Sequence, residues 1–358
     1  SLLELHQPLP KRPRFGEPQK FLPVIFVMVT ICFLFCSYIN YHCAFLLQLN
    51  VPKDRVDQSM RTRGTVELVI FLYLTTLLLI CYVRSILAHP GEIPDGDPQW
   101  EYLPQDGQAI DWMPMSLQEM KKTGERRHCK WCGKYKPDRC HHCRVCRMCI
   151  LKMDHHCPFI KNCVGFGNYK VFLLLLVYGS CSCAVSLVTA FPELLICLES
   201  VVCGTGTPSL QDPLQGLDIR RSDAWLLLLF GALALPFMMI FPPMASSHFM
   251  LAAHNQTRIE NSYSNMPNPY NMGTGQNFGQ IFGEFGVDWV LPVKPWRRKL
   301  NGVSFARNDI NAGGKMGLDA DADSVDHQRL LRIRYKVPLP DAMRFPVLEG
   351  QGCTSLIC

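Results

Sequence analysis

Cysteine and histidine residues are concentrated in one short stretch, residues 128–169. It holds eight of the chain's 18 Cys and five of its 11 His: Cys129, Cys132, Cys140, Cys143, Cys146, Cys149, Cys157, Cys163, His128, His141, His142, His155 and His156. Repeated C-x-x-C spacing with interleaved His is typical of zinc sites, in which four thiolate or imidazole ligands surround one ion. Two zinc ions would use eight of these side chains. Composition therefore predicts a metal module with spare ligands, and it does not say which residues are spare.

The run Asp154-His155-His156-Cys157-Pro158 could also carry out covalent chemistry. A nucleophilic Cys needs a neighbouring base that generates thiolate, and the base needs a group that orients it. In an extended segment His155 and Cys157 face the same way and His156 faces the opposite way, while Pro158 favours an extended conformation at Cys157. Asp154 can orient His155 only if the backbone turns there. The alternative is that His155 and Cys157 are two further metal ligands.

Long apolar runs on both sides of the module must position it. A helix needs about 20 apolar residues to cross a bilayer, and four runs meet that length: residues 21–47, 66–87, 171–202 and 224–250. The short, charged segment 50–64 is expected to form a hairpin loop between the first two. Pro192 and Glu193 interrupt the third run. Pro236, Pro242 and Pro243 predict kinks or an early end of the fourth helix.

The net charge of the chain is +6, and much positive charge lies in the module. Residues 121–170 contain 13 Lys and Arg against three acidic residues, a local net charge of 13 − 3 = +10. Such a segment suits a cytosolic surface near anionic lipid, or an anionic cosubstrate. Reducing cytosol also favours thiolates around metal over disulfides.

The expected fold class is a membrane α-helical protein, with four transmembrane helices and a cytosolic Cys-rich double-zinc module between helices 2 and 3. Both termini should then be cytosolic. The expected organisation is a tail at 1–20, helices 1 and 2 within 21–88, a loop at 89–170 with the module at about 126–170, helices 3 and 4 within 171–250, a segment at 251–300 and a flexible tail at 301–358. Nucleic acid is not expected as a partner.

The module closely resembles the DHHC family of protein S-acyltransferases. Besides the D-H-H-C run, the similarity includes K-P-D-R at 136–139, H-H-C at 141–143, C-I-L-K-M-D-H-H-C-P-F at 149–159 and N-C-V-G-F-G-N-Y-K at 162–170. It extends over about residues 20–295. The resemblance implies an integral membrane palmitoyltransferase that moves a long-chain acyl group from palmitoyl-CoA or a similar acyl-CoA to cysteines of membrane-associated proteins.

Carried over residue by residue, the resemblance implies roles for the module. Cys157 would be the acyl-accepting nucleophile, His155 its base, and Asp154 the residue that orients His155. The two structural Zn²⁺ sites would use Cys129, Cys132, His142 and Cys149, and Cys143, Cys146, His156 and Cys163. Cys140 has no role in this scheme.

The resemblance continues beyond the module with departures. Asp-Pro-Gly after the second span is replaced by His89-Pro90-Gly91, and Thr-Thr-x-Glu after the fourth by Thr257-Arg258-Ile259-Glu260. Residues 270–283 resemble a C-terminal motif in which Asn277 is the matching Asn. These elements are expected to brace the module against the spans, and the departures leave dependence on an accessory subunit open.

Contacts to the acyl-CoA are expected from two groups of residues. Cations for the CoA phosphates would be Arg126, Arg127, Lys136 and Arg139. Phe159 and Phe172 could line the mouth of an acyl cavity, and Ser182 lies in a run of small residues on the third span. Small residues also favour close helix packing, which is the alternative interpretation. Golgi, endoplasmic reticulum and plasma membrane are all compatible locations.

Two other classes of function are compatible with the metal ligands. A membrane-anchored zinc adaptor or ubiquitin-ligase-like module would need no free Cys and no acyl cavity. A redox or metal sensor would use Cys140 and Cys157 as spare thiols. A His-x-Cys-Pro run beyond the ligands that two zinc ions require favours the enzyme.

Overall fold

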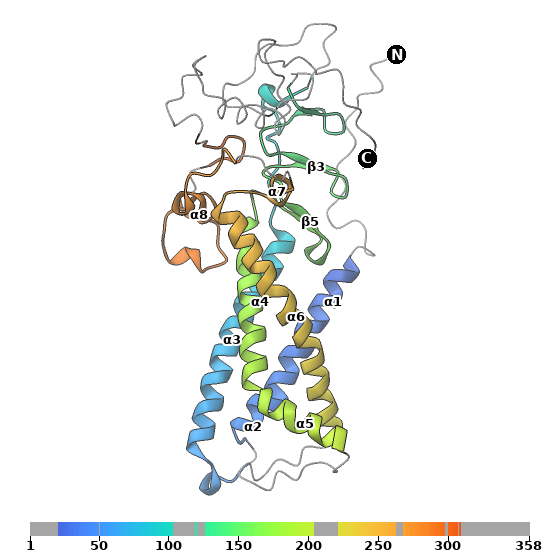
Figure 1. The fold of residues 1–358 in the computed structure, drawn as a ribbon, viewed down its shortest axis with the longest axis vertical. Coiled ribbons are helices and arrows are strands. Elements are labelled where there is room, and N and C mark those ends of the chain that lie inside the picture. Colours follow the sequence, from blue (N-terminus) through green and yellow to red (C-terminus); the bar gives the residue numbers. More distant parts are fainter. Residues whose placement is uncertain are drawn as a thin grey trace, which may run out of the picture.

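A computed structural model of the chain describes residues 21–49, 51–102, 119, 126–203, 221–262, 268–297, 300–306 and 308. The tail predicted at 1–20, most of the tail predicted at 301–358, and residues 204–220 lie outside the described residues. Four helices of the described part are long and apolar enough to cross a membrane. They form an elongated bundle, and the Cys-rich module stands over one of its ends (Figure 1). The expected fold class is confirmed.

The first span is less regular than predicted, and the second is longer. The first comprises α1 (Leu22–Tyr38), a π-helical turn (Ile39–Cys43) and α2 (Ala44–Leu46). The second, α3 (Gln58–Leu87), begins eight residues before the apolar run, so the prediction of a loop through residue 64 is wrong. Asp57 caps this start by accepting hydrogen bonds from the backbone N–H groups of Ser59 and Met60.

The third span ends where the sequence predicts an interruption. Helix α4 (Tyr169–Thr189) stops at Ala190, and a separate helix, α5 (Phe191–Cys203), follows. The fourth span, α6 (Arg221–Ala253), continues through all three of its prolines, so the predicted early end is wrong. A spanning helix tolerates Pro where neighbouring groups satisfy the freed backbone carbonyls.

Helix α4 lies at the centre of the bundle and packs against both α3 and α6. A Cβ atom at Gly179 would lie 2.8 Å from the ring of Phe241 in α6, so Gly179 permits close helix packing. The central core cluster contains Leu173, Leu174 and Leu176 of this helix, and all three are buried. Helix α4 therefore connects the module, from which it emerges at Tyr169, to the interior of the bundle.

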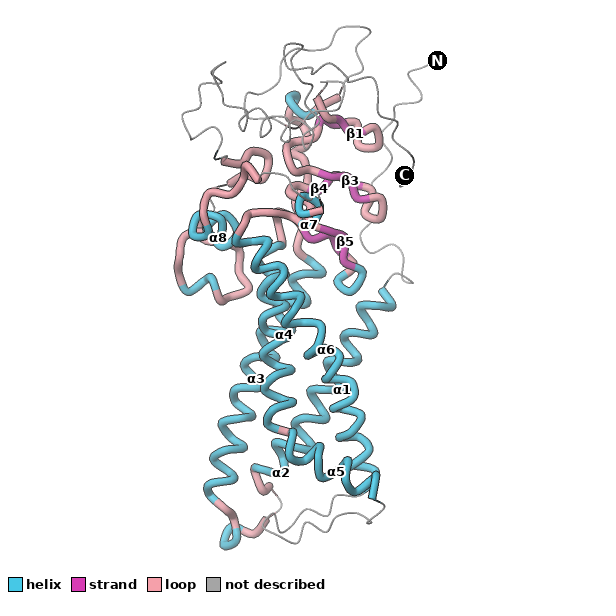
Figure 2. The backbone as a smooth tube through the Cα atoms, viewed as in Figure 1, coloured by secondary structure: helices cyan, strands magenta, loops and turns pink. Residues whose placement is uncertain are grey.

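The module consists of three antiparallel hairpins stacked along its length (Figure 2). The strands are β1 (His128–Cys129) with β2 (Lys134–Tyr135), β3 (His141–Cys143) with β4 (Met148–Ile150), and β5 (His155–Cys157) with β6 (Asn162–Val164). The turns contain residues with positive φ, namely Gly133, Arg147 and Lys161. Strands of two or three residues cannot form a stable sheet alone, so this part of the chain needs another source of stability.

The segment after α6 returns to the module. It contains the short helix α7 (Arg258–Asn261) and the amphipathic helix α8 (Thr274–Phe282). Thr257 and Glu260 form a capping box at the start of α7. Figure 1 shows α7 beside the module and α8 beside the adjacent end of the bundle, so this segment contacts both parts.

Candidate active site and metal centres

Two groups of three Cys and one His come together in the module. The possible ligand atoms of Cys129, Cys132, His142 and Cys149, and those of Cys143, Cys146, His156 and Cys163, lie within 4.8 Å of one another in each group. In the first group, His142 Nδ1 lies 3.4, 3.3 and 3.9 Å from the three sulfur atoms. In the second, His156 Nδ1 lies 3.7, 3.4 and 3.6 Å from its three. A tetrahedron with Zn–S bonds of about 2.3 Å and Zn–N bonds of about 2.0 Å has edges of roughly 3.5–3.8 Å. Both groups therefore fit a four-coordinate metal ion.

The hairpin register explains how ligands distant in sequence meet. His142 pairs directly with Cys149 across β3 and β4, and His156 pairs with Cys163 across β5 and β6. Each of these pairs receives a C-x-x-C turn from the preceding hairpin. Each metal group therefore joins two successive hairpins. A bound metal ion would stabilise the module, which has little apolar core of its own.

Asp154 and His155 lie outside these two Cys/His groups and form a hydrogen-bonded pair next to the Cys157 thiol. His155 Nδ1 lies 2.7 Å from Asp154 Oδ2. The other carboxylate oxygen accepts the backbone N–H of Arg258 at 2.9 Å, and Asp154 donates its own N–H to Val164 O. The contact between Asp154 and His155 on which the orientation of His155 depends is therefore present. His155 and Cys157 lie on the same face of β5 and line the same cavity.

The electrostatics of this site favour a charged pair. Burial lowers the pKa of the His155 imidazole, but the hydrogen bond to Asp154 and the neighbouring Cys157 sulfur outweigh burial and raise it to about 9. Burial raises the pKa of the Cys157 thiol. The hydrogen bond and charge of His155, together with the N–H groups of Ile160 and Phe159, lower that pKa by more than burial raises it. The net pKa of Cys157 is below its usual value, which favours thiolate.

An apolar cavity of about 340 Å³ opens beside Cys157 and extends into the bundle. All four spans contribute to its wall, for example Phe26 in α1, Leu78 in α3, Leu175 in α4 and Met244 in α6. Phe159, Phe172 and Ser182 lie on this wall. Phe172 is buried next to the ring of His155, 5.4 Å between centroids, and Phe159 is 55% exposed. Ser182 therefore borders free space, while the nearby Gly179 packs against Phe241.

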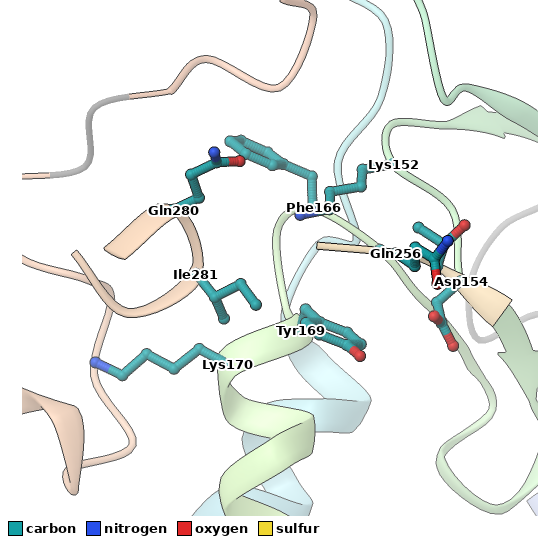
Figure 3. A pocket seen from close by; sticks show the side chains of 10 residues that line it. Lys152, Asp154, Phe166, Tyr169, Lys170, Gln256, Gln280 and Ile281 are labelled. Carbon is teal, nitrogen blue, oxygen red and sulfur yellow. The ribbon is translucent and has the colours of Figure 1, made fainter. Parts of the chain in front are cut away.

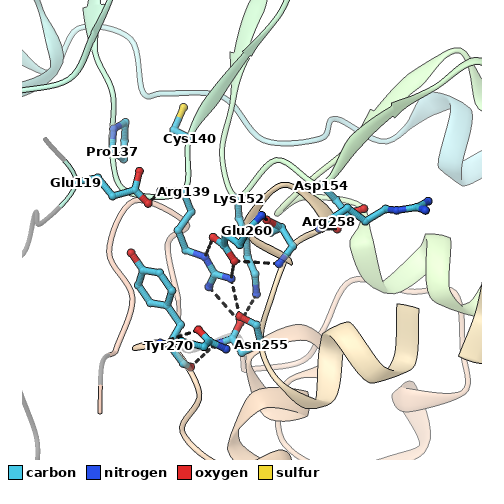
Figure 4. Close-up of polar contacts among 12 residues, drawn as sticks. Glu119, Pro137, Arg139, Cys140, Lys152, Asp154, Asn255, Arg258, Glu260 and Tyr270 are labelled. Atoms are coloured by element: carbon cyan, nitrogen blue, oxygen red, sulfur yellow. Dashed lines mark hydrogen bonds and ion pairs between the residues drawn. The ribbon is translucent and has the colours of Figure 1, made fainter. Parts of the chain in front are cut away.

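A buried ionic network supports the far side of Asp154 (Figure 4). The Arg139 guanidinium donates to both Glu260 carboxylate oxygens, at 2.7 and 2.8 Å, and to the side chain and backbone oxygens of Asn255, at 3.1 and 2.7 Å. Lys152 donates to Asn255 at 2.7 Å. Since Glu260 also completes the capping box of α7, this network fixes the helix whose first N–H holds Asp154.

A small polar hollow lies between this network and the start of α4 (Figure 3). It has a volume of about 20 Å³ and is lined by Lys152, Asp154, Tyr169, Lys170 and Gln280, among others. A space of this size accommodates about one water molecule and no acyl chain. The apolar cavity is therefore the space that suits a lipid substrate.

The four predicted phosphate-binding cations differ in their surroundings. The structure contradicts the expectation for Arg139, which is fully buried and bound by Glu260 and Asn255. Arg127 is largely buried and forms an ion pair with Glu119. Arg126 stacks over Trp100 and Tyr135, and Lys136 is half-buried. Arg126 and Lys136 stay predictions.

The bracing residues are brought together despite their departures from the family pattern. Asn277 donates to Ala253 O at 2.7 Å and is fully buried. Arg258 contacts Asp154 through its backbone N–H, so replacing Thr with Arg at this position does not remove the contact. At the other departure, His89 Nδ1 accepts the N–H of Gly91, and Pro90 O accepts the N–H of Gly167 in the module.

Sequence reasoning missed three residues that support the site. His248 in α6 is fully buried, and its Nδ1 lies 3.9 Å from Asp154 Oδ2. Asn162 donates to Ser85 O and Ala88 O at the end of α3, which links β6 to the bundle. Asn255 binds Arg139. A lone His in an apolar helix was a usable signal for His248, whereas Asn162 and Asn255 resemble ordinary turn residues.

The comparisons with known proteins agree with this geometry. The family model for DHHC palmitoyltransferases matches residues 122–265. Probable protein S-acyltransferase 13 of Arabidopsis thaliana is 35% identical over 289 residues, which cover 78% of this chain and 88% of that protein. Palmitoyltransferase ZDHHC2 of Homo sapiens is 36% identical over 247 residues, 66% of this chain and 61% of that protein. Probable protein S-acyltransferase 14 of Arabidopsis thaliana is 31% identical over 235 residues, which cover 63% of this chain and 71% of that protein.

The fold and the site define a multi-pass membrane protein that carries a Cys/His module with two potential metal centres. The chain belongs to the DHHC palmitoyltransferase family. It is an acyltransferase that modifies proteins, and the adaptor and sensor alternatives are set aside.

Proposed function

We propose that the acyl group passes through a thioester on Cys157. The observation that carries this proposal is the position of the Asp154–His155 pair and Cys157 at the mouth of an apolar cavity, while eight other Cys and His residues form the two metal groups. The cosubstrate is a long-chain acyl-CoA such as palmitoyl-CoA. The acyl chain enters the cavity, and its thioester carbon lies near the Cys157 sulfur.

The reaction has two steps. In the first, Cys157 thiolate attacks the carbonyl carbon of acyl-CoA, the C–S bond to CoA breaks, and imidazolium His155 gives its proton to the departing CoA thiolate. In the second, neutral His155 removes the proton of an acceptor thiol, whose sulfur attacks the acyl-Cys157 carbonyl. The Cys157 thiolate leaves beside the imidazolium, which restores the charged pair.

Asp154 determines which nitrogen of His155 exchanges protons. Its hydrogen bond to Nδ1 leaves Nε2 of His155 as the nitrogen that exchanges protons with the reacting sulfur atoms. The carboxylate also stabilises the imidazolium form. Asp154 is itself held by the N–H of Arg258, so the capping box and the Arg139 network act on the reaction through this residue.

We infer that the metal in both groups is zinc, because three thiolates and one imidazole form a closed ligand set that Zn²⁺ prefers. Cys129, Cys132, His142 and Cys149 would hold one ion, and Cys143, Cys146, His156 and Cys163 the other. When bound, the zinc ions supply stability and no open coordination position. They therefore fix the position of β5 and take no part in bond making.

The acceptors in this proposal are cysteines of membrane-associated proteins, on the side of the membrane that faces the module. We place that side in the cytosol, because the module carries a local net charge of +10. The first and last described residues also lie on the module's side: Phe21 lies under the Lys161 ammonium, and Asn308 is bonded to Pro269 near α7 and α8. This supports termini on the cytosolic side.

The proposal is tested by three Cys→Ser variants incubated in detergent with labelled palmitoyl-CoA. Cys157→Ser should lose hydroxylamine-sensitive label and keep the zinc content of the unaltered chain. Cys146→Ser, in a metal group, should lose zinc. Cys181→Ser, an exposed thiol in α4, should keep both label and zinc. Equal label in Cys157→Ser, or zinc loss in that variant, would return Cys157 to the metal ligands.

A further inference from the structure

Residues 283–297, here called the C-terminal loop, present an unusual concentration of exposed apolar side chains. Outside helices α1–α6, the described residues include nine large apolar side chains that are exposed. Three of them are scattered, and six belong to this loop: Phe285, Val287, Val290, Leu291, Val293 and Trp296. Phe285, Val287 and Trp296 are 88%, 80% and 76% exposed. A contiguous apolar surface of this kind indicates a partner.

The loop lies along the side of a membrane span. The Tyr178 hydroxyl donates a hydrogen bond to Val290 O. Tyr178 is nine residues beyond Tyr169, the first residue of α4, so its Cα lies about 14 Å along the helix axis from that end. Helical side chains lean about one turn toward the N-terminus, which here is the module's end. Val290 is therefore level with the first turns of the apolar helix.

A charged contact marks the upper boundary of this region. Lys170 is the second residue of α4, and its Nζ lies 3.2 Å from Asp288 Oδ2. Both side chains are buried, and Figure 3 shows that of Lys170 extending away from Asp154. The ion pair lies where the apolar run of α4 begins. The loop thus crosses the level at which the bundle changes from apolar span to polar module.

The loop also satisfies many of its own polar groups. Trp289 Nε1 donates to Glu284 O at 2.9 Å, and the Trp289 and Leu291 N–H groups donate to Gly286 O and Asp288 O. Arg297 pairs with Glu284 at 3.1 Å, which joins the two ends of the loop. Irregular backbone beside lipid is tolerated only when its polar groups have partners or reach the interface.

We propose that the C-terminal loop is a membrane-surface anchor, seated in the interfacial zone of the leaflet on the module's side. The exposed rings of Phe285 and Trp296, together with the exposed Lys294, form a combination that favours this zone, because aromatic rings prefer the headgroup level and cations bind anionic lipid. The occupant is phospholipid and not a second chain, because Val290 lies level with the first turns of a membrane span, where exposed apolar side chains face lipid.

A chain of hydrogen bonds connects the anchor to the active site. The loop follows α8, where Asn277 binds Ala253 O at the end of α6 and Gln280 accepts a hydrogen bond from Asn255 at 2.9 Å. Asn255 belongs to the Arg139 network. Seating the loop in lipid therefore holds this brace, and with it the module, at a fixed height above the bilayer.

The test uses the full chain with a photo-crosslinking benzoylphenylalanine at Phe285 or at Trp296, in nanodiscs of phosphatidylcholine and phosphatidylserine. Both sites replace one exposed aromatic ring by another, so folding should be preserved. Ile80 in α3 is the lipid-facing control, and Val145 in the module, about as exposed as Ile80, is the apolar control outside the membrane. After irradiation, mass spectrometry measures lipid adducts and crosslinked chains.

Adducts at Phe285 and Trp296 should match those at Ile80 and exceed those at Val145 by at least about tenfold, the ratio that burial of one large apolar side chain supports. A second measurement uses lipids that carry bromine at different depths along the acyl chain. Trp296 fluorescence, taken as the signal that the Trp296→Phe variant lacks, should be quenched most by the shallowest bromines. Adducts at Ile80 alone would overturn the proposal. Chain-to-chain crosslinks at Phe285 and Trp296 would overturn it in favour of a dimer surface.

Discussion

Replacing Arg139 by Ala should be among the most destabilising single changes in the Cys-rich module. The guanidinium is fully buried and makes two hydrogen bonds of 2.7 and 2.8 Å to Glu260 and two to Asn255. Its removal breaks a buried ion pair and leaves the Glu260 carboxylate without a neutralising guanidinium, which typically costs about 3–5 kcal/mol. A whole domain is stable by only about 5–15 kcal/mol, so much of the population would unfold under mild denaturation.

The assay is urea unfolding in detergent, with tryptophan fluorescence as the signal and the free energy of unfolding as the result. Arg297→Ala is the matched control, because that Arg also pairs with a Glu but is 79% exposed, and an exposed pair contributes at most about 1 kcal/mol. Arg139→Met together with Glu260→Met should cost less than Arg139→Met alone, since no unpaired charge is left buried. Equal losses for Arg139→Ala and Arg297→Ala would refute this reasoning.

Three further predictions concern the reaction. Ser182→Phe should fill part of the cavity and shift the preferred acyl-CoA to a shorter chain in a competition assay; an unchanged chain-length preference would exclude Ser182 from the acyl path. Arg126→Glu should raise the acyl-CoA concentration needed for half-maximal rate roughly tenfold or more, as expected for a lost charge-assisted contact, with the zinc content unchanged; an unaltered concentration dependence would remove Arg126 from the phosphate contacts. Asp154→Asn should slow acyl transfer by about 10²–10⁴-fold. Because the carboxylate raises the pKa of His155, its loss should leave less imidazolium at neutral pH, so alkylation of Cys157 should begin at higher pH; a pH profile that does not move would contradict the role of Asp154.

The parts of the site that sequence could predict are those encoded by local spacing. The C-x-x-C turns and the pairs His142–Cys149 and His156–Cys163 lie within one short module, so the ligand supply was visible before any fold was known. The alternation of His155, His156 and Cys157 along β5 follows from strand geometry in the same way. The four spans followed from the length of the apolar runs.

What sequence could not show depends on contacts distant along the chain. Arg139 looked like one more surface cation because its partner, Glu260, is 121 residues away. The start of α3 was assigned to a loop because its residues are polar, yet Gly64 packs there so closely that a Cβ atom would lie 2.5 Å from Leu46. The prolines of α6 were expected to kink the helix or end it early, but the helix continues through all three because tertiary packing in the bundle overrides the tendency to end.

Location of the acyl group on the enzyme tests the central claim most directly. The purified chain would be incubated briefly with palmitoyl-CoA, without acceptor protein, and digested under mildly acidic conditions for peptide mass spectrometry. The account predicts one palmitoyl thioester, on the peptide that contains Cys157, which hydroxylamine removes. A palmitoyl group that accumulates on another Cys while Cys157 stays unmodified would contradict it.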